Sequence, residues 1–180
     1  EYMESMFALF KAGLVPVNTN YRYADDELVY LWDNADAVAV VFHGAFADRI
    51  EGIRDRVPDV RTWLWVDDGS GPCPTWATAY EDAAKAGTTE PVSAPWGRDG
   101  DHIYMLYTGG TTGMPKGVMW RQDDIFGALN ATAPLQYGTE PDYAAAAEAV
   151  GKQGPGIVGL PACPLMHGTG AFTAITVLNV

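Results

Sequence analysis

The segment Tyr107–Gly117 carries the residue types in this chain that are best suited to chemistry. It reads Y-T-G-G-T-T-G-M-P-K-G, with four glycines, three threonines and one lysine in eleven positions. Glycine lets the backbone approach a ligand closely, and successive backbone N–H groups in such a loop form a concave anion site. Threonine hydroxyls and a lysine ammonium add donors suited to phosphate oxygens. We therefore expect this segment to bind a polyphosphate.

The distribution of charge favours the same interpretation. The 180-residue chain holds 11 basic and 23 acidic residues, for a net charge of -12. The window from His102 to Gln122 nevertheless contains Lys116 and Arg121 and no Asp or Glu. A locally positive window inside an acidic protein favours an anionic ligand there. The acidic balance argues against nucleic acid and anionic membrane as partners, because both require clustered Lys and Arg.

Two common phosphate-binding motifs do not describe this loop. The Walker A motif needs a lysine between a glycine and a Ser or Thr, whereas Lys116 lies between Pro115 and Gly117. The dinucleotide motif G-x-G-x-x-G would need a glycine at the position of Thr108.

Two further patterns limit the class of protein. No run of about 18 apolar residues occurs, so the sequence predicts no transmembrane segment. The two cysteines, Cys73 and Cys163, are too few and too far apart for a disulfide framework or a zinc site. We therefore expect reduced thiols and a cytoplasmic location.

The elements that position the glycine-rich loop follow from alternating strand and helix patterns. Apolar runs of strand length alternate with helical patterns, which predicts an α/β fold of layered, mostly parallel sheets flanked by helices. Strands are predicted over residues 37–42, 61–66, 102–107, 118–120 and 157–160. Helices are predicted at the start of the chain, over residues 25–34, 45–56, 75–85, 123–130 and 142–150, and in the tail after residue 170.

The Gly- and Pro-rich stretch 87–100 is predicted to be a loop that separates two parts of one domain. The first α/β part covers residues 1–100, and the second part, with the glycine-rich loop, covers residues 101–180. A helix that starts at once and an apolar final segment also suggest that both ends are cuts, because exposed apolar area is unfavourable in water. We therefore expect an interior slice of a longer protein.

Several polar and aromatic residues outside the loop are predicted to be structural. His43 and His102 have no metal-like partners at suitable spacing. Asp123 and Asp124 lie where a helix starts, so helix capping is their expected role. The six tryptophans are expected to pack in the interior.

The glycine-rich segment resembles the phosphate-loop signature of the adenylate-forming (AMP-binding) superfamily, whose common form is T-S-G-T-T-G-x-P-K-G. This superfamily includes acyl-CoA synthetases, luciferases and peptide-synthetase adenylation domains. Gly13–Asn20 (GLVPVNTN) with the acidic helix Asp25–Asn34, and Pro164–Gly170 (PLMHGTG), resemble the regions upstream and downstream of the signature in acyl-CoA synthetases. The resemblance implies an internal fragment of the large N-terminal domain, without the C-terminal lid domain.

The resemblance also implies roles for individual residues. His167, with Gly168, would lie between the nucleotide and the acyl pocket. His167 would be the catalytic residue and orient the carboxylate or adenylate, because a carboxylate is already ionised at pH 7 and needs no base. Thr108 would also approach Mg²⁺. The β- and γ-phosphates of ATP would be held by Thr108, Gly109, Gly110, Thr111, Thr112, Gly113 and Lys116. Gly109 departs from the family's Ser, which removes one hydroxyl and leaves a backbone donor.

The function implied by the resemblance is that of an ATP-dependent, AMP-forming acyl-CoA synthetase, an acid–thiol ligase. It would activate a fatty or sterol-derived carboxylic acid as an acyl-adenylate and pass the acyl group to CoA. ATP, Mg²⁺ and CoA are the implied cofactors and co-substrates, and a homodimer of the parent enzyme is compatible with the resemblance. The family's later adenine, ribose, Mg²⁺-binding Glu and C-terminal Lys motifs have no counterpart here, so we expect the chain alone to be inactive.

Other functions stay open at this point. They are an amino-acid or aryl-acid adenylation domain, a luciferase-like oxidation, and an inactive truncated nucleotide-binding module. The amino-acid reading is disfavoured because no Asp or Glu lies between Gly151 and Val180, where a buried substrate ammonium would need a partner. The chain length of the acid, medium, long or sterol-like, is also open.

Overall fold

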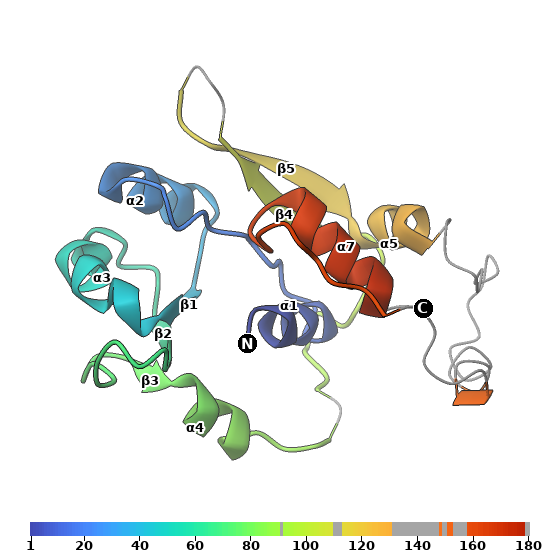
Figure 1. Cartoon of the computed structure of the whole chain (residues 1–180), viewed down its shortest axis with the longest axis horizontal. Coiled ribbons are helices and arrows are strands. Elements are labelled where there is room, and N and C mark those ends of the chain that lie inside the picture. The colour runs from blue at the N-terminus through green and yellow to red at the C-terminus, as the bar shows by residue number, and fades with distance from the viewer. Residues whose placement is uncertain (91, 110–112, 131–147, 149–150, 153–157, 179–180) are drawn as a thin grey trace.

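The structure is a computed structural model that describes residues 1–90, 92–109, 113–130, 148, 151–152 and 158–178. Figure 1 shows the arrangement of its elements. The strands are β1 (Ala39–His43), β2 (Thr62–Val66), β3 (Thr78–Ala79), β4 (Ile103–Thr108) and β5 (Lys116–Arg121). The helices are α1 (Tyr2–Lys11), α2 (Asp25–Asn34), α3 (Ala47–Ile53), α4 (Tyr80–Ala86), α5 (Gln122–Asn130) and α7 (Gly168–Leu178). The 3-10 turns η1 (Gly44–Phe46) and η2 (Arg54–Arg56) flank α3.

A three-stranded parallel sheet, in the order β1-β2-β3, forms the first half of the fold. Its strands are rich in β-branched and aromatic residues, which pack well on a pleated surface. Helices α2 and α3 each pack one apolar side against this sheet. The buried residues are Leu31 and Trp32 on α2, and Ile50 and Ile53 on α3. The Trp32 and Trp63 rings meet edge to face, with centroids 5.6 Å apart. The parallel sheet and the buried helix faces confirm the sequence-based expectations.

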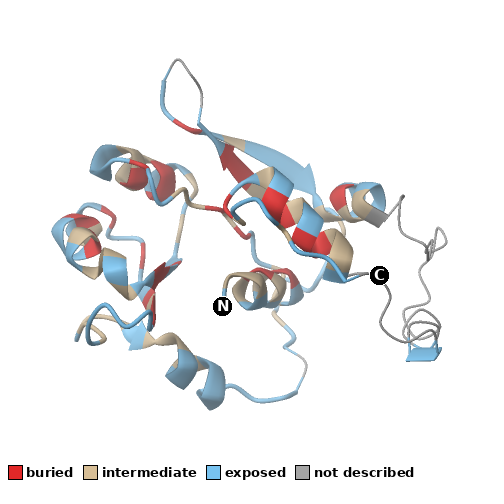
Figure 2. Cartoon of the chain, in the orientation of Figure 1, coloured by how far each residue is buried: buried red, intermediate tan, exposed pale blue. Residues whose placement is uncertain are grey.

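A second apolar cluster surrounds β4. Strands β4 and β5 form an antiparallel hairpin whose register runs from Ile103 opposite Arg121 to Thr108 opposite Lys116. The buried residues of this cluster come from α1, β4, α5 and α7; they are Met6, Phe10, Tyr104, Leu106, Ile125 and Ile175. Figure 2 shows buried residues in red on α1, β4, α5 and α7. The first helix of the chain therefore packs on the strand that leads into the glycine-rich loop.

Some predicted elements differ from the structure. The predicted helix start at residue 75 is wrong, because Thr78 and Ala79 pair with Leu64 and Trp65 as β3 and α4 begins only at Tyr80. The predicted strand at 157–160 is wrong for residues 158–160, which have no regular structure, and residue 157 lies outside the described residues. Most of the predicted helix 142–150 also lies outside them. The antiparallel pairing of β4 with β5 is compatible with the prediction of mostly parallel sheets, which named no orientation for this pair. Among the described residues, no helix has both the length and the apolar character needed to cross a bilayer.

Helix α7 packs closely on the chain before it, and Gly170 makes this possible. A Cβ at Gly170 would lie 2.4 Å from the carbonyl oxygen of Pro164 and 2.6 Å from that of Cys163. These neighbours are backbone atoms and cannot rotate away. Gly127 in α5 is also helical, but no described atom lies within 4 Å of the Cβ position there. Both glycines are helical, Gly170 in the first turn of α7 and Gly127 in the middle of α5, but only Gly170 has backbone atoms close to its Cβ position.

Gly170→Ala is expected to lower the free energy of unfolding by about 2 kcal/mol, because the new methyl group forces α7 off residues 163–164. Gly127→Ala is the matched control and should raise it by up to about 1 kcal/mol, because alanine favours a helix over glycine. Urea unfolding of the purified chain, followed by tryptophan fluorescence, measures both values. Equal midpoints for the two variants would contradict this account.

Candidate functional site

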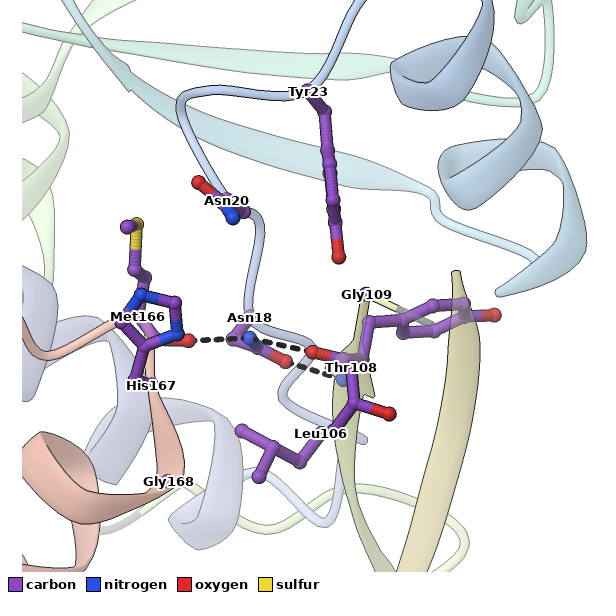
Figure 3. Close-up of a pocket in the computed structure, with 10 residues that line it drawn as sticks. Asn18, Asn20, Tyr23, Leu106, Thr108, Gly109, Met166, His167 and Gly168 are labelled. Carbon is purple, nitrogen blue, oxygen red and sulfur yellow. Dashed lines mark hydrogen bonds between the residues drawn. The ribbon is translucent and has the colours of Figure 1, made fainter. Parts of the chain in front are cut away.

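A pocket of about 330 Å³ lies where three distant parts of the chain meet. Its walls come from the segment after α1, from the end of β4, and from the residues at the start of α7 (Figure 3). The lining residues are Asn18, Asn20, Tyr23, Leu106, Tyr107, Thr108, Gly109, Met166, His167 and Gly168. All three parts belong to segments whose motifs the sequence singled out.

The buried side chain of Asn18 joins these three parts. It is only 3% exposed. Its Oδ1 accepts a hydrogen bond from the Tyr107 N–H at 2.6 Å, and its Nδ2 donates to the carbonyl oxygens of Tyr107 at 3.3 Å and Met166 at 2.5 Å. An amide whose donors and acceptor are all used is well suited to a buried position. One side chain therefore fixes the end of β4 and the residue before His167 to the same point.

The backbone beside Asn18 extends this attachment. The carbonyl oxygen of Pro16 accepts a hydrogen bond from the Met105 N–H at 3.1 Å, and Val17 forms a parallel bridge with Met105. Residues 16–17 thus lie beside β4 and pair with it over a short stretch. Asn18 was not predicted as a site residue, although it lies in the GLVPVNTN stretch. Its only sequence signal is a polar residue directly after the apolar Pro16–Val17 pair.

The start of the glycine-rich loop lies at the mouth of the pocket. Thr108 ends β4 and is exposed, and Gly109 follows it on the pocket wall. Lys116 begins β5 directly opposite Thr108, and it forms no ion pair with another described residue. The hairpin register therefore places a hydroxyl and a lysine ammonium at the base of one loop. Such a donor set fits the oxygens of a phosphate group.

Not all of the predicted loop residues can be compared with the structure. Gly110, Thr111 and Thr112 lie outside the described residues. Gly113 is exposed and has a φ of 150°, a conformation that favours glycine. Neither Gly113 nor Lys116 lines the pocket itself.

His167 and Gly168 line the pocket on the side opposite the loop. The His167 N–H donates to the Pro164 carbonyl oxygen at 3.0 Å. The His167 carbonyl oxygen accepts from the Ala171 N–H, also at 3.0 Å. These bonds fix the backbone of His167 at the beginning of α7. The N-terminus of a helix carries a partial positive charge, so α7 adds favourable potential for an anion at this wall.

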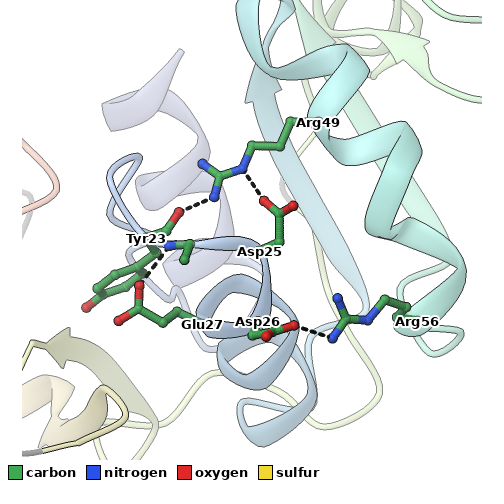
Figure 4. Close-up of polar contacts among 7 residues, drawn as sticks. Tyr23, Asp25, Asp26, Glu27, Arg49 and Arg56 are labelled. Atoms are coloured by element: carbon green, nitrogen blue, oxygen red, sulfur yellow. Dashed lines mark hydrogen bonds and ion pairs between the residues drawn. The ribbon is translucent and has the colours of Figure 1, made fainter.

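Tyr23 and Asn20 complete the pocket, and neither was predicted as a site residue. Tyr23 is 6% exposed, and burial, with a smaller contribution from Glu27, raises the pKa of its hydroxyl. Its carbonyl oxygen accepts a hydrogen bond from Arg49, which also pairs with Asp25 at 2.6 Å. Figure 4 shows the contacts of Arg49 with Tyr23 and Asp25, and a second ion pair between Arg56 and Asp26.

The pocket offers oxygen ligands but no carboxylate. None of its lining residues is acidic, and no group of three or more His, Cys, Asp or Glu with metal-binding geometry occurs among the described residues. Mg²⁺ commonly binds through phosphates together with one or two carboxylates. An Mg²⁺ ion beside these described lining residues would therefore need phosphate or water oxygens for most of its ligands.

Comparison with known proteins decides the family. The family model described as AMP-binding enzyme matches residues 1–178. The chain belongs to this family. Among its relatives in the AMP-binding family, the 3-oxocholest-4-en-26-oate–CoA ligase of Rhodococcus rhodochrous is 36% identical over 170 residues, which cover 93% of this chain and 30% of that ligase. A medium/long-chain-fatty-acid–CoA/3-oxocholest-4-en-26-oate–CoA ligase of Mycobacterium tuberculosis is 40% identical, covering 93% of this chain and 31% of the ligase.

The solved structures agree with this family. The ATP-bound crystal structure of MatB from Rhodopseudomonas palustris superposes with a TM-score of 0.62 at 27% identity, over 96% of this chain and 29% of that one. The α/β fold of this AMP-binding chain is thus the fold of known adenylate-forming enzymes. The chain spans about 30% of the length of the curated relatives that it matches.

Asn18→Ala is expected to lower the free energy of unfolding by about 3 kcal/mol, because it leaves buried groups of Tyr107 and Met166 without partners. Asn20→Ala is the matched control, since the Asn20 Oδ1 accepts only an exposed bond from the Arg22 N–H at 3.0 Å. We expect that variant to lose less than about 1 kcal/mol. Urea unfolding of the chain distinguishes the two, and similar losses would show that Asn18 does not hold the three parts together.

Proposed function

We propose that this chain is the phosphate-loop part of the N-terminal domain of an ATP-dependent, AMP-forming acyl-CoA synthetase. The enzyme joins a carboxylate to the α-phosphorus of ATP with release of pyrophosphate, and then transfers the acyl group from AMP to the CoA thiol. The observation that carries the proposal is the single pocket that Thr108 and Gly109 share with His167. A phosphate-binding loop and an acyl-orienting histidine must face each other for this reaction.

The loop side of the pocket has the chemistry needed for the leaving group. Negative charge develops on pyrophosphate as the α-phosphorus is attacked, and preorganised donors stabilise that charge. The Thr108 hydroxyl, the loop N–H groups and the Lys116 ammonium supply such donors at one end of the hairpin. A bound Mg²⁺ would neutralise further phosphate charge, and Thr108 is the residue that we propose would help to hold it through its hydroxyl.

The other side of the pocket orients the carboxylate. We infer that the His167 side chain contacts the acid or the adenylate and sets the attacking oxygen in line with phosphorus. It has no need to remove a proton, because the carboxylate is ionised at neutral pH. The N-terminus of α7, which begins at Gly168, favours the same negative charge.

The proposed substrates are large apolar carboxylic acids. This rests on relatives that are named for medium- and long-chain fatty acids and for 3-oxocholest-4-en-26-oate. An amino acid fits less well, because no lining residue is acidic and a buried ammonium would have no partner. The cytoplasmic location, the homodimer and the division of the domain at residue 100 are further predictions; the free thiols of Cys73 and Cys163 are compatible with the first.

Lys116→Ala in the full-length enzyme is expected to lower the rate of adenylation at least about tenfold, because it removes the cation opposite Thr108. Carboxylate-dependent ATP–pyrophosphate exchange measures this rate. Lys85→Ala serves as the control, since Lys85 is exposed on α4 and pairs only with Glu81 at 3.7 Å. An unchanged exchange rate in the Lys116 variant would remove this lysine from the site.

The 180-residue chain on its own is expected to show no ligase activity, because the remaining motifs of the reaction have no counterpart in it. The measurement is pyrophosphate release from ATP in the presence of dodecanoate, CoA and Mg²⁺, with the full-length enzyme as the positive control. Release by the chain above an enzyme-free blank would refute this prediction.

A further inference from the structure

Gly109 leaves an unfilled position on the pocket wall, and the structure shows which side chain lies beside it. The AMP-binding signature has a serine here, so this chain lacks one hydroxyl at the loop. A Cβ placed on Gly109 would meet only one described atom within 4 Å of it, outside its own chain neighbours. That atom is the hydroxyl oxygen of Tyr23, at 4.0 Å. A serine hydroxyl at residue 109 and the Tyr23 hydroxyl would therefore share one small region of the pocket.

The Tyr23 side chain reaches this region from the other half of the fold. Its ring packs in the apolar cluster of the parallel sheet, while Figure 3 shows its hydroxyl directed toward Gly109 in the pocket. The backbone is held at both ends of the residue. The Tyr23 N–H donates to the Asn20 carbonyl at 3.0 Å, and Arg49 donates to the Tyr23 carbonyl (Figure 4). The buried ring and the two backbone hydrogen bonds thus hold the Tyr23 hydroxyl in one position relative to the loop.

The Tyr23 hydroxyl is suited to donate to an anion. A tyrosine hydroxyl is protonated at neutral pH, and burial raises the pKa of this one further. No described residue forms a hydrogen bond with it, although it lies on a pocket wall together with Thr108. An anionic oxygen of a bound ligand would be a suitable acceptor for this proton, because no acidic residue among the described residues lines the pocket and competes for it.

We propose that the Tyr23 hydroxyl donates a hydrogen bond to a phosphoryl oxygen of the bound nucleotide and thereby supplies the hydroxyl that Gly109 lacks. This inference rests on the proposed adenylation function. It makes Tyr23 a nucleotide-binding residue that comes from outside the glycine-rich loop, and it links the absence of a serine at residue 109 to the presence of a tyrosine at residue 23.

The test is a double-variant cycle at residues 23 and 109 in the full-length enzyme. Tyr23→Phe should lower the kcat of dodecanoate-dependent ATP–pyrophosphate exchange about tenfold, because it deletes a hydrogen bond to a charged oxygen. Adding Gly109→Ser to that variant should restore the rate to within about threefold of the wild type, because serine returns a hydroxyl to the same region. Gly109→Ser alone should stay within about threefold of the wild type.

Two controls separate a binding role from a structural one. Tyr21→Phe removes the hydroxyl of an exposed tyrosine outside the pocket and should leave the exchange rate unchanged. The thermal unfolding midpoint of Tyr23→Phe should stay within about 2 °C of the wild type. A rate lost through poor packing would not return when serine is added at residue 109.

The outcomes discriminate between this inference and the proposed function. A full exchange rate in Tyr23→Phe, or an equal loss with and without Gly109→Ser, overturns the role of Tyr23. If either of these outcomes occurs while the wild type is active and Lys116→Ala is impaired in the same assay, the adenylation function stands and only the Tyr23 inference fails. A wild-type enzyme with no carboxylate-dependent exchange overturns both.

Discussion

The pocket depends on the buried amide of Asn18, because this one group satisfies main-chain atoms of two separate segments. Its partners Tyr107 and Met166 lie 89 and 148 positions away in the sequence. Main-chain groups shielded from water must find a protein partner, and a missing partner costs more than a made bond contributes. Any displacement of β4 relative to the start of α7 would leave one of these groups unpaired. The distance between the loop and His167 is therefore fixed by hydrogen bonding and not by apolar packing alone.

Much of the fold could be predicted because it depends on local patterns. The apolar side of α2, with Leu28, Leu31 and Trp32, is buried as its periodicity indicates. The alternation of helices with the β1 and β2 runs likewise indicates a parallel sheet. The short strand β3 could not be predicted, because two residues carry no periodicity and its existence depends on the edge that β2 offers. The antiparallel pairing of β4 with β5 depends on how the loop between them turns, which residue types alone do not determine.

The site shows the same division between local and long-range information. Thr108, Gly109, His167 and Gly168 line one pocket, and all four come from segments that linear motifs single out. Their roles in binding stay predictions. Asn18 and Tyr23 contribute as much to its walls, but their importance comes from contacts with residues far along the chain. A buried asparagine and a tyrosine near a helix start have many ordinary roles. Only the folded arrangement distinguishes these two from the other Asn and Tyr residues.

The packing of α1 on β4 also has a consequence for the order of folding. Phe10 and Tyr104 meet with ring centroids 5.9 Å apart, although the whole parallel sheet lies between them in the sequence. Contacts within that sheet join residues much nearer to each other along the chain, so they close smaller loops at a lower entropic cost. We expect the sheet to form before α1 can dock. The pocket, whose walls come from both sides of that long loop, would then be among the last parts of the protein to assemble during synthesis and refolding.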